Sequence, residues 1–524
     1  MRKAVIALLA ILLLSAPAAD AFWFSDKAKS DDLLVIFEEL DLKGADAETV
    51  RKLEGYVDSN PRSDYMDEAL LRLGRIYRDR KELPKAAETY RLLLFNFPAS
   101  KFRHEAWIEL GLLEYRTGRL DQAREAFEAV KGDRDASIAQ RAKAARFLSE
   151  IEKASFGITV PSNLPAIGVL LPLSGDYASF GEDALSGILL ATGIFGPRAR
   201  QVEVIVKDVS DPASISGAVQ ELASNGRVLG IIGPLLSSNA LDVARQAQMH
   251  KLPVITLSQR EGVTDAGDYV FRNFLTPEDQ ARALASYASK ELGARRFAVL
   301  HPQNSYGTEL ARHFEMAVKE NGGTVVRKAA YPHGTADFTD TVKRIFGVQS
   351  KERKEGRRVI REFEPTIRVD ALFIPDSHEQ AALIAPYLEY FSIKDVKLLG
   401  SNGWNSPRLV ELAGKNVEGA VFVDGFYAMS RRSGTEEFAR EYGATFGKSP
   451  GILSAHAFDS ARMLLHAVTG SGPGYGREDV RDRLKGLREF RGATGAISFN
   501  PRREAEKRLF ILTVENGRIV EAGN

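Results

Sequence analysis

Two neighbouring hydroxyl side chains stand where an apolar stretch of the sequence passes into a helical pattern. Ser237 and Ser238 follow the run VLGIIG (228–233) and three further turn residues. A serine at the start of a helix can cap it, and the unpaired N–H groups there also favour a bound carboxylate. Two interpretations, N-capping and hydrogen bonding to a ligand, therefore stay open for this pair.

Three further polar side chains occupy similar turns after apolar segments. Arg260 follows PVITLS (253–258), while Asp376 and His378 lie in the turn PDSHEQ after ALFIP (371–375). A guanidinium attracts an anion and repels an ammonium group. If these segments are parallel strands, their carboxyl ends share the edge of a sheet at which such folds bind ligands, so these residues are candidates for a binding site.

The sequence contains none of the short motifs that usually identify an enzyme. There is no GxSxG elbow, no Walker A loop, no HExxH pair and no GxGxxG after a strand, and the eight histidines do not fall at metal-ligand spacings. Cysteine is absent, which excludes disulfides, thiolate metal sites and cysteine nucleophiles. We therefore expect a non-catalytic protein without a metal or another cofactor.

Length and composition bound the class of protein. The 524 residues are too many for one ordinary domain, and 44% hydrophobic with 27% charged residues is typical of a soluble globular chain. A formal net charge of +1 provides no basic excess for nucleic acid or an anionic membrane surface. Neither is an expected partner.

The first 21 residues have the three parts of a secretory signal peptide. Arg2 and Lys3 precede an apolar run at 4–14 and an A-x-A cleavage signal at 19–21. The alternative, a membrane anchor, is disfavoured because the apolar run is too short to span about 30 Å of hydrocarbon. We expect cleavage after Ala21 and a product free in the periplasm, with no transmembrane segment and, for want of a cysteine, no lipoprotein anchor.

Residues 25–155 have helical periodicity and contain an internal repeat. Residues 67–98 can be laid over residues 104–130 at an offset of thirty-seven, which pairs Gly74 with Gly111, Leu83 with Leu120, Ala86 with Ala123 and Tyr90 with Phe127. The pattern resembles the tetratricopeptide repeat (TPR), in which small residues let paired helices approach and aromatic residues fill the groove between them. Glu114 departs from it, because an aromatic residue is usual at that position.

The flanks of this repeat extend the helical module. Residues 30–62 are similar to a degenerate leading unit and residues 137–154 to a capping helix, which helps to reach the number of units that such arrays need. The module is predicted either to dock a protein partner, such as a membrane transporter or a cell-wall synthase, or to act as a spacer. Residues 156–165 carry two prolines and are predicted to form a linker.

Residues 166–524 alternate between strand and helix patterns. The stretch IGVLLPLSGDYASFGEDALSGILLA (167–191) joins an apolar run, a polar turn and a helical stripe, the first unit of a doubly wound α/β fold. Later strands are expected at 202–208, 228–233, 253–258, 268–274, 295–301, 324–331, 371–375, 396–401, 419–426 and 493–500, with a terminal hairpin over 508–520. The charged insertion 348–368 is predicted to be a solvated helical segment or a contact surface for an acidic partner.

Four motifs carry a family resemblance. PLSGDYASFG, GIIGPLLSS (230–238), PVITLS and HPQNSYGTELA (301–311) resemble, in this order, the type I periplasmic ligand-binding proteins of the branched-chain amino-acid (Leu/Ile/Val) binding family. The resemblance implies two lobes joined by connections at 268–274, 419–426 and 493–500, closing by hinge motion on a small-molecule ligand. Lobe 1 would comprise 166–274 and 426–490, and lobe 2 would comprise 275–425 and 491–520.

The resemblance also implies roles for individual side chains. Ser258 and Arg260 lie where the family places a carbonyl and a hydroxyl against the ligand's ammonium group. Phe180 matches an aromatic wall of lobe 1, with core packing as the alternative, and Tyr306 matches a tyrosine that closes from lobe 2. Asn402 stands where the family has the acid that anchors the ammonium, and an amide supplies no charge. Arg260 and Asn402 together argue against a classical α-amino-acid ligand.

Two functions follow from these observations. The first is a periplasmic solute-binding protein for an amino acid or a related small anion, linked to amino-acid transport through an ABC transporter. The second rests on architecture, because a helical-repeat module before a type I binding domain is similar to the activators of penicillin-binding proteins. In that alternative the two-lobed domain is a scaffold that regulates peptidoglycan synthesis.

Overall fold

The computed structural model describes residues 32–42, 44–60, 63–155, 164–194, 201–332, 334–355, 358–469 and 475–523. The chain divides into two compact units, residues 1–159 and 160–524, and each is described by itself. The predicted signal peptide and most of the predicted linker lie outside the described residues. Within the described ranges, no helix is both long and apolar enough to cross a membrane.

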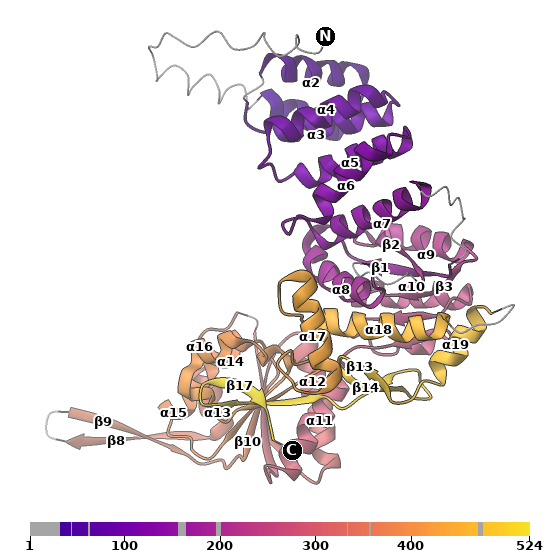
Figure 1. Ribbon diagram of the computed structural model, residues 1–524. Helices are drawn as coiled ribbons and strands as arrows, with labels where there is room; N and C mark the ends of the chain where they lie inside the picture. Colours follow the sequence, from indigo (N-terminus) through magenta and orange to yellow (C-terminus); the bar gives the residue numbers. More distant parts are fainter. Residues whose placement is uncertain are drawn as a thin grey trace, which may run out of the picture. The chain divides into compact units, whose positions relative to one another are not determined.

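The first unit is built of antiparallel helix pairs (Figure 1). After a helical segment at 32–42, its helices are α2 (Ala47–Ser59), α3 (Met66–Asp79), α4 (Leu83–Asn96), α5 (Arg103–Arg116), α6 (Leu120–Lys131) and α7 (Ile138–Ser155). The repeat is confirmed in space, because α3 pairs with α4 as α5 pairs with α6. A Cβ at Gly74 would lie 2.5 Å from the Tyr90 ring, and one at Gly111 would lie 2.8 Å from the Phe127 ring. Glycine is therefore what lets each pair approach.

Glu114, which breaks the repeat pattern, is buried in the first unit. Its two carboxylate oxygens form ion pairs with Arg91 of α4 and Arg119 at the start of α6. The two guanidinium groups compensate the buried charge where the repeat usually places an aromatic ring. The ion pairs of Glu114 thus link α4, α5 and the start of α6.

Lobe 1 of the second unit contains a five-stranded parallel sheet. Its strands are β1 (Ala166–Leu171), β2 (Glu203–Asp208), β3 (Val228–Ile232), β4 (Val254–Thr256) and β5 (Val270–Arg272), in the order β2-β1-β3-β4-β5. Helices α9 (Ile215–Ser224) and α10 (Ser237–Met249) bury one face. On the other face α8 (Ala178–Ala191) packs against α18 (Ile452–Val468), next to α17 (Ser433–Phe446) and α19 (Arg477–Lys485). Burial on both faces explains why β1 is apolar throughout.

Lobe 2 contains a seven-stranded sheet of order β17-β16-β12-β11-β10-β6-β7. The parallel strands are β6 (Arg296–Pro302), β7 (Thr324–Tyr331), β10 (Ala371–Ile374), β11 (Lys397–Gly400) and β12 (Val421–Asp424). The antiparallel edge is the hairpin of β16 (Phe510–Glu515) and β17 (Arg518–Glu521), turned at Asn516-Gly517 as predicted. Helices α11 (Pro277–Lys290) and α12 (Ser305–Glu320) cover one face, and α13 (Thr339–Phe346), α14 (His378–Ile384), α15 (Pro386–Tyr390) and α16 (Pro407–Ala413) cover the other.

The insertion 348–368 is a β-hairpin, so the predicted helical segment is wrong. Strands β8 (Val348–Glu355) and β9 (Arg358–Pro365) pair with each other and project from lobe 2 (Figure 1). Opposite charges meet across the pair, with Glu352 bound to Arg361 at 3.1 Å. At the base, the Phe363 ring contacts the rings of Tyr390 and Phe391. These cross-strand contacts favour the hairpin over a helix.

Three segments connect the two sheets. Residues 273–276 join β5 to α11, and residues 425–432 join β12 to α17. The third connection is at 507–509, C-terminal to the predicted 493–500. The preceding strands β13 (Phe490–Gly492), β14 (Gly495–Phe499) and β15 (Ala505–Glu506) form a small sheet of their own, whose Phe499 packs on Phe271 of lobe 1.

Candidate functional site

The lobe 1 half of the candidate site lies at the N-terminus of α10. Ser237 and Ser238 are the first residues of this helix, and its N-cap is Leu236, with no side-chain capping bond. The N-capping interpretation is therefore wrong. The Ser237 hydroxyl lies 3.2 Å from that of Ser258, whereas the Ser238 hydroxyl donates to Asn239 at 3.0 Å. Ser237 and Ser258 are brought together at the N-terminus of α10, and Ser238 is not part of the pair.

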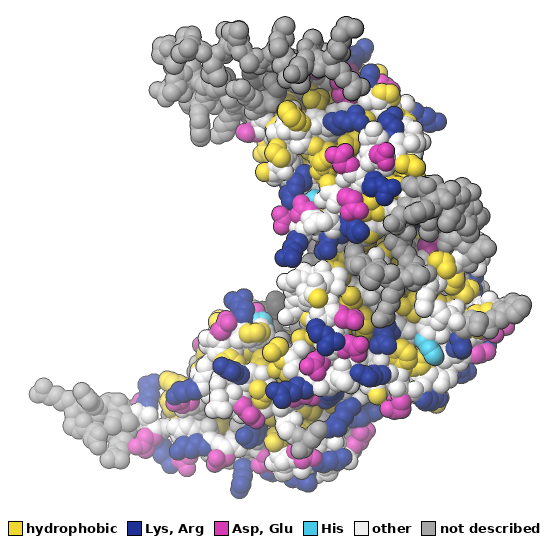
Figure 2. Space-filling model, in the orientation of Figure 1, with side chains coloured by type: hydrophobic (Ala, Val, Ile, Leu, Met, Phe, Trp, Pro, Cys, Tyr) yellow, Lys and Arg dark blue, Asp and Glu magenta, His cyan; other side chains and the backbone are white. Residues whose placement is uncertain are grey.

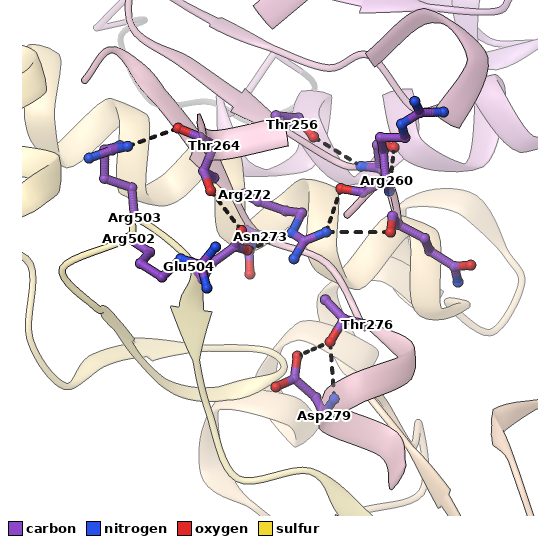
Figure 3. Close-up of polar contacts among 12 residues, drawn as sticks. Thr256, Arg260, Thr264, Arg272, Asn273, Thr276, Asp279, Arg502, Arg503 and Glu504 are labelled. Atoms are coloured by element: carbon purple, nitrogen blue, oxygen red, sulfur yellow. Dashed lines mark hydrogen bonds and ion pairs between the residues drawn. The ribbon is translucent and has the colours of Figure 1, made fainter. Parts of the chain in front are cut away.

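Arg260 lies in the loop that follows β4, and its backbone is held on both sides. Its N–H donates to the Ser258 hydroxyl at 3.0 Å, and its carbonyl accepts from Arg272 Nη1 at 2.6 Å (Figure 3). Arg272 is itself fixed by an ion pair with Glu504 at 2.5 Å. The Arg260 side chain is exposed and points away from this network, and it has no ion pair among the residues that the structure describes.

Phe180 stands at the start of α8, at the carboxyl edge of the lobe 1 sheet. Its side chain is 50% exposed, so the alternative of core packing does not hold. Tyr177, which is 52% exposed, lies next to it with the two ring centroids 6.3 Å apart. The two rings offer an apolar surface at the edge where doubly wound folds bind ligands.

The lobe 2 half of the candidate site joins Tyr306 and Asn402. The Tyr306 hydroxyl lies 2.7 Å from Asn402 Oδ1 and 3.0 Å from the Ser401 hydroxyl. Gln280 of α11 accepts a hydrogen bond from the Asn402 N–H at 3.0 Å, which orients the turn after β11. Burial, together with the charges of nearby carboxyl groups, raises the pKa of Tyr306 to about 12. The hydroxyl therefore stays protonated and available for hydrogen bonding at neutral pH.

Asp376 and His378 are bound to lobe 2 itself. The Asp376 carboxylate accepts from the Tyr331 hydroxyl at 2.6 Å and from the Ser377 N–H at 2.7 Å. Burial and this carboxylate raise the pKa of Tyr331. His378 Nε2 lies 3.0 Å from the carboxylate of its neighbour Glu379. Asp376 thus fixes the edge of the sheet, although its charge also acts on Tyr306.

One acid near Tyr306 escaped the sequence analysis. Asp424 is the last residue of β12 and is only 5% exposed. It accepts from Asn405 Nδ2 at 2.7 Å and from the Gly425 N–H at 2.6 Å, and burial raises its pKa to about 7. Its sequence signal is a carboxylate that ends the apolar run VFVD, inside the segment 419–426 that is predicted only to connect the lobes. At neutral pH Asp424 is therefore a weak source of negative charge.

Charged side chains of both signs are mixed on the visible face of the molecule (Figure 2). Lysine and arginine are interspersed with aspartate and glutamate over the face shown in Figure 2, in line with the net charge of +1. Within the described residues, no cluster of histidine, aspartate and glutamate could hold a metal ion. The candidate site consists of hydroxyl groups, amides, one guanidinium and a helix N-terminus, a set suited to binding polar solutes by hydrogen bonds.

Two α/β lobes, three connections and hydrogen-bonding groups at the facing sheet edges define the class of two-lobed solute-binding proteins. The chain belongs to the periplasmic binding protein family, whose sequence model matches residues 166–518. A tetratricopeptide repeat model matches residues 68–100.

Relatives and solved structures agree with this family. A Leu/Ile/Val-binding protein homolog of Brucella abortus is 24% identical over 380 residues, which cover 67% of this chain and 89% of the relative. An ABC transporter substrate-binding protein from Sphaerobacter thermophilus is similar with a TM-score of 0.56 and 25% identity, over 68% of this chain and 96% of that one. A solute-binding protein of an ABC transporter from Rhodopseudomonas palustris, in complex with 3,4-dihydroxybenzoic acid, has a TM-score of 0.52 and 22% identity, over 68% and 95%.

Proposed function

We propose that residues 166–524 capture a small solute bearing a carboxylate, an amino acid or a related small anion, between the two lobes. The observation that carries the proposal is the Ser237–Ser258 hydroxyl pair at the N-terminus of α10, with the exposed side chain of Arg260 two residues further along the same loop. Each of these groups favours a negatively charged oxygen. The family supports a non-catalytic role, with the protein exported to the periplasm and presenting its solute to a membrane transporter.

Within this class, a small organic anion fits the site better than a zwitterionic amino acid. An ammonium group needs a nearby carboxylate, but Asn402 is uncharged and the Asp376 carboxylate is engaged by Tyr331. Arg260 would repel an ammonium group placed near it. The Rhodopseudomonas palustris protein, whose complex contains an aromatic acid, supports the idea that this fold accepts such anions.

The experiment is a thermal-shift screen of the mature protein against amino acids and small organic anions, followed by Arg260→Ala. A ligand that binds only the folded state stabilises it by about 2.7 kcal/mol at a concentration of 100 Kd. Loss of one charge-assisted contact of about 1.5 to 3 kcal/mol should weaken binding roughly tenfold to a hundredfold. The matched control is Arg245→Ala, because Arg245 is an exposed arginine further along α10. Equal affinity in both variants would remove Arg260 from the site.

A second candidate function is a scaffold for a cell-wall synthase, similar to the activators of penicillin-binding proteins. The observation that favours it is the helical module, where Phe95 is 85% exposed and Leu92 is 45% exposed on α4. Phe95, Trp107 and the buried Glu114 line one hollow of that module. If the module docks a partner, a chain that begins near Pro165 should lose that partner in a pull-down against membrane transporters and cell-wall synthases. Retention would make the module a spacer.

A further inference from the structure

The three connections between the lobes converge on one turn of α18. This turn, residues 456–460, is buried: His456, Asp459 and Ser460 each have no exposed surface. The first connection reaches it by direct hydrogen bonds, the second packs against it, and the third is joined to it through bridging side chains. Each contact can be traced to a particular atom.

The first connection contacts α18 through Asn273. Its amide Nδ2 donates to the His456 carbonyl at 3.2 Å and to the Ser460 hydroxyl at 3.0 Å. Its Oδ1 accepts from Lys507 Nζ at 2.7 Å, and Lys507 belongs to the third connection. Because the amide donates on one side and accepts on the other, its orientation is defined by its partners. A single side chain thus joins the first connection, the third connection and α18.

Lys507 of the third connection is also joined to Asp459 of α18 through Thr494, which lies in the turn between β13 and β14. Lys507 Nζ donates to the Thr494 hydroxyl at 3.1 Å, and that hydroxyl donates to Asp459 at 2.7 Å. The Asp459 carboxylate accepts two backbone N–H groups as well, from Ala493 at 2.6 Å and Thr494 at 2.8 Å. A Cβ at Gly492 would lie 2.6 Å from this carboxylate, so the backbone approaches it as closely as glycine allows.

The second connection packs against the same turn. A Cβ at Gly425 would lie 2.9 Å from the His456 ring, and the centroid of the Phe274 ring, from the first connection, lies 4.9 Å from that of the imidazole. His456 Nδ1 is 2.9 Å from the Ile452 carbonyl, which orients the imidazole. The first and second connections therefore contact His456 directly, and Lys507 of the third is joined to the same turn of α18 through Asn273 and Thr494.

We propose that Lys507 is a positioning residue that couples the three connections, so that the network of Lys507, Asn273, Thr494 and Asp459 sets the angle between the lobes. An apolar hinge would let each connection change its backbone torsions separately. Here a rotation of the third connection moves Lys507 Nζ away from Asn273, and it leaves a buried amide oxygen without its donor. The three connections consequently change their backbone torsions together when the lobes move relative to each other. This inference does not depend on which solute is bound, or on whether one is bound.

The absence of cysteine makes the experiment direct, because two introduced cysteines label uniquely. Met249 of α10 and Met316 of α12 are 70% and 52% exposed and lie on different lobes, so Met249→Cys and Met316→Cys place a spin label on each. Pulsed dipolar spectroscopy of the full chain then measures the inter-lobe distance distribution. Lys507→Met should broaden this distribution and shift it toward longer distances. Lys415→Met, at an exposed lysine paired with Glu389, is the matched control and should change neither.

A pH arm separates positioning from simple packing. Burial lowers the pKa of Lys507 to about 8, so a change from about pH 7 to about pH 9.5 should neutralise it and broaden the wild-type distribution. The titratable groups that face Lys507 are Asp459, Asp279 and His456. Burial raises the pKa of both carboxyl groups and holds that of His456 well below its ordinary value, so His456 stays neutral at both pH values. Lys507→Met keeps both carboxyl groups, so its distribution shows whether they contribute to the response to pH. Lys507→Met should be broad at both pH values.

The proposal is overturned if Lys507→Met matches Lys415→Met in width and mean distance. Should Lys507→Met fail to fold, Thr494→Val provides the decision, because it removes only the hydroxyl between Lys507 and Asp459. Broadening in Thr494→Val, together with the wild-type response to pH, supports the coupling. An unchanged distribution in both measurements refutes it.

Discussion

Gly400 and Trp404 are expected to be coupled in stability, because each restricts the space of the other. The indole is completely buried in the lobe 2 core, and its Nε1 donates to the Ile374 carbonyl at 3.1 Å. A Cβ at Gly400 would lie 2.5 Å from Trp404 Cγ, well inside van der Waals contact. The turn between these residues carries Asn402, so their packing also positions the lobe 2 half of the candidate site.

The structure predicts the size of each effect. Gly400→Ala overpacks the site and should cost about 1 to 3 kcal/mol. Trp404→Ala leaves a large cavity and should cost about 3 to 5 kcal/mol. In the double variant the new methyl group occupies part of that cavity without meeting the indole. Its cost should therefore be close to that of Trp404→Ala alone, which gives a coupling of about 1 to 3 kcal/mol.

Hydrogen exchange of the amides in β10 to β12 measures the opening free energy of this lobe without requiring the whole chain to unfold in one step. Gly443→Ala is the control, because no atom lies within 4 Å of a Cβ at that helical glycine. It should be neutral or stabilising by up to about 1 kcal/mol. If the cost of the double variant equals the sum of the costs of Gly400→Ala and Trp404→Ala within about 0.5 kcal/mol, the steric reasoning is refuted.

Two further predictions concern other parts of the chain. Gly74→Ala should destabilise the helical module, because the new Cβ would lie 2.5 Å from the Tyr90 ring. Gly55→Ala, whose Cβ would have no atom within 4 Å, should instead stabilise its helix by up to about 1 kcal/mol. Thermal unfolding of both variants, followed by circular dichroism, checks that the two changes in stability have opposite signs. Asp424 has a folded-state pKa of about 7, above its unfolded value of about 3.9, so the folded state binds its proton more tightly. The free energy of unfolding should therefore fall by about 4 kcal/mol as the pH rises from about 3.9 to about 7. Asp424→Asn should remove that part of the slope in urea titrations at a series of pH values, and an unchanged slope would show that Asp424 titrates normally.

Much of the fold was predictable because its determinants are local. Continuous apolar runs at β1 and β3 require burial on both faces, and their alternation with helical patterns implies a doubly wound sheet. The offset between Gly74 and Gly111 predicted helix pairs, which the close approach of each glycine to an aromatic ring explains. The terminal hairpin was predictable from Asn516-Gly517, since both residues adopt positive φ.

The hairpin at 348–368 was missed because its stability comes from pairs across the strands. Alternating charges along one strand are compatible with a helix as well as with a strand. Only the antiparallel register places Glu352 opposite Arg361 and brings Phe363 onto two aromatic rings of another element. The third connection was placed too early for a similar reason, because β14 packs on lobe 1 through a contact distant in sequence.

The sequence by itself determined the family, the helical module and most of the residue types at the candidate site, because these depend on local pattern and on motifs read in order. Tertiary structure alone decided what those residues can do. It paired Ser237 with Ser258, engaged Asp376 with Tyr331 and left the Arg260 side chain exposed. It also brought Asn273 and Lys507, far apart in the chain, to the same turn of α18. Hydrogen bonding and burial act over a few ångströms in space, whatever the separation in sequence, and for this reason only the folded chain reveals them.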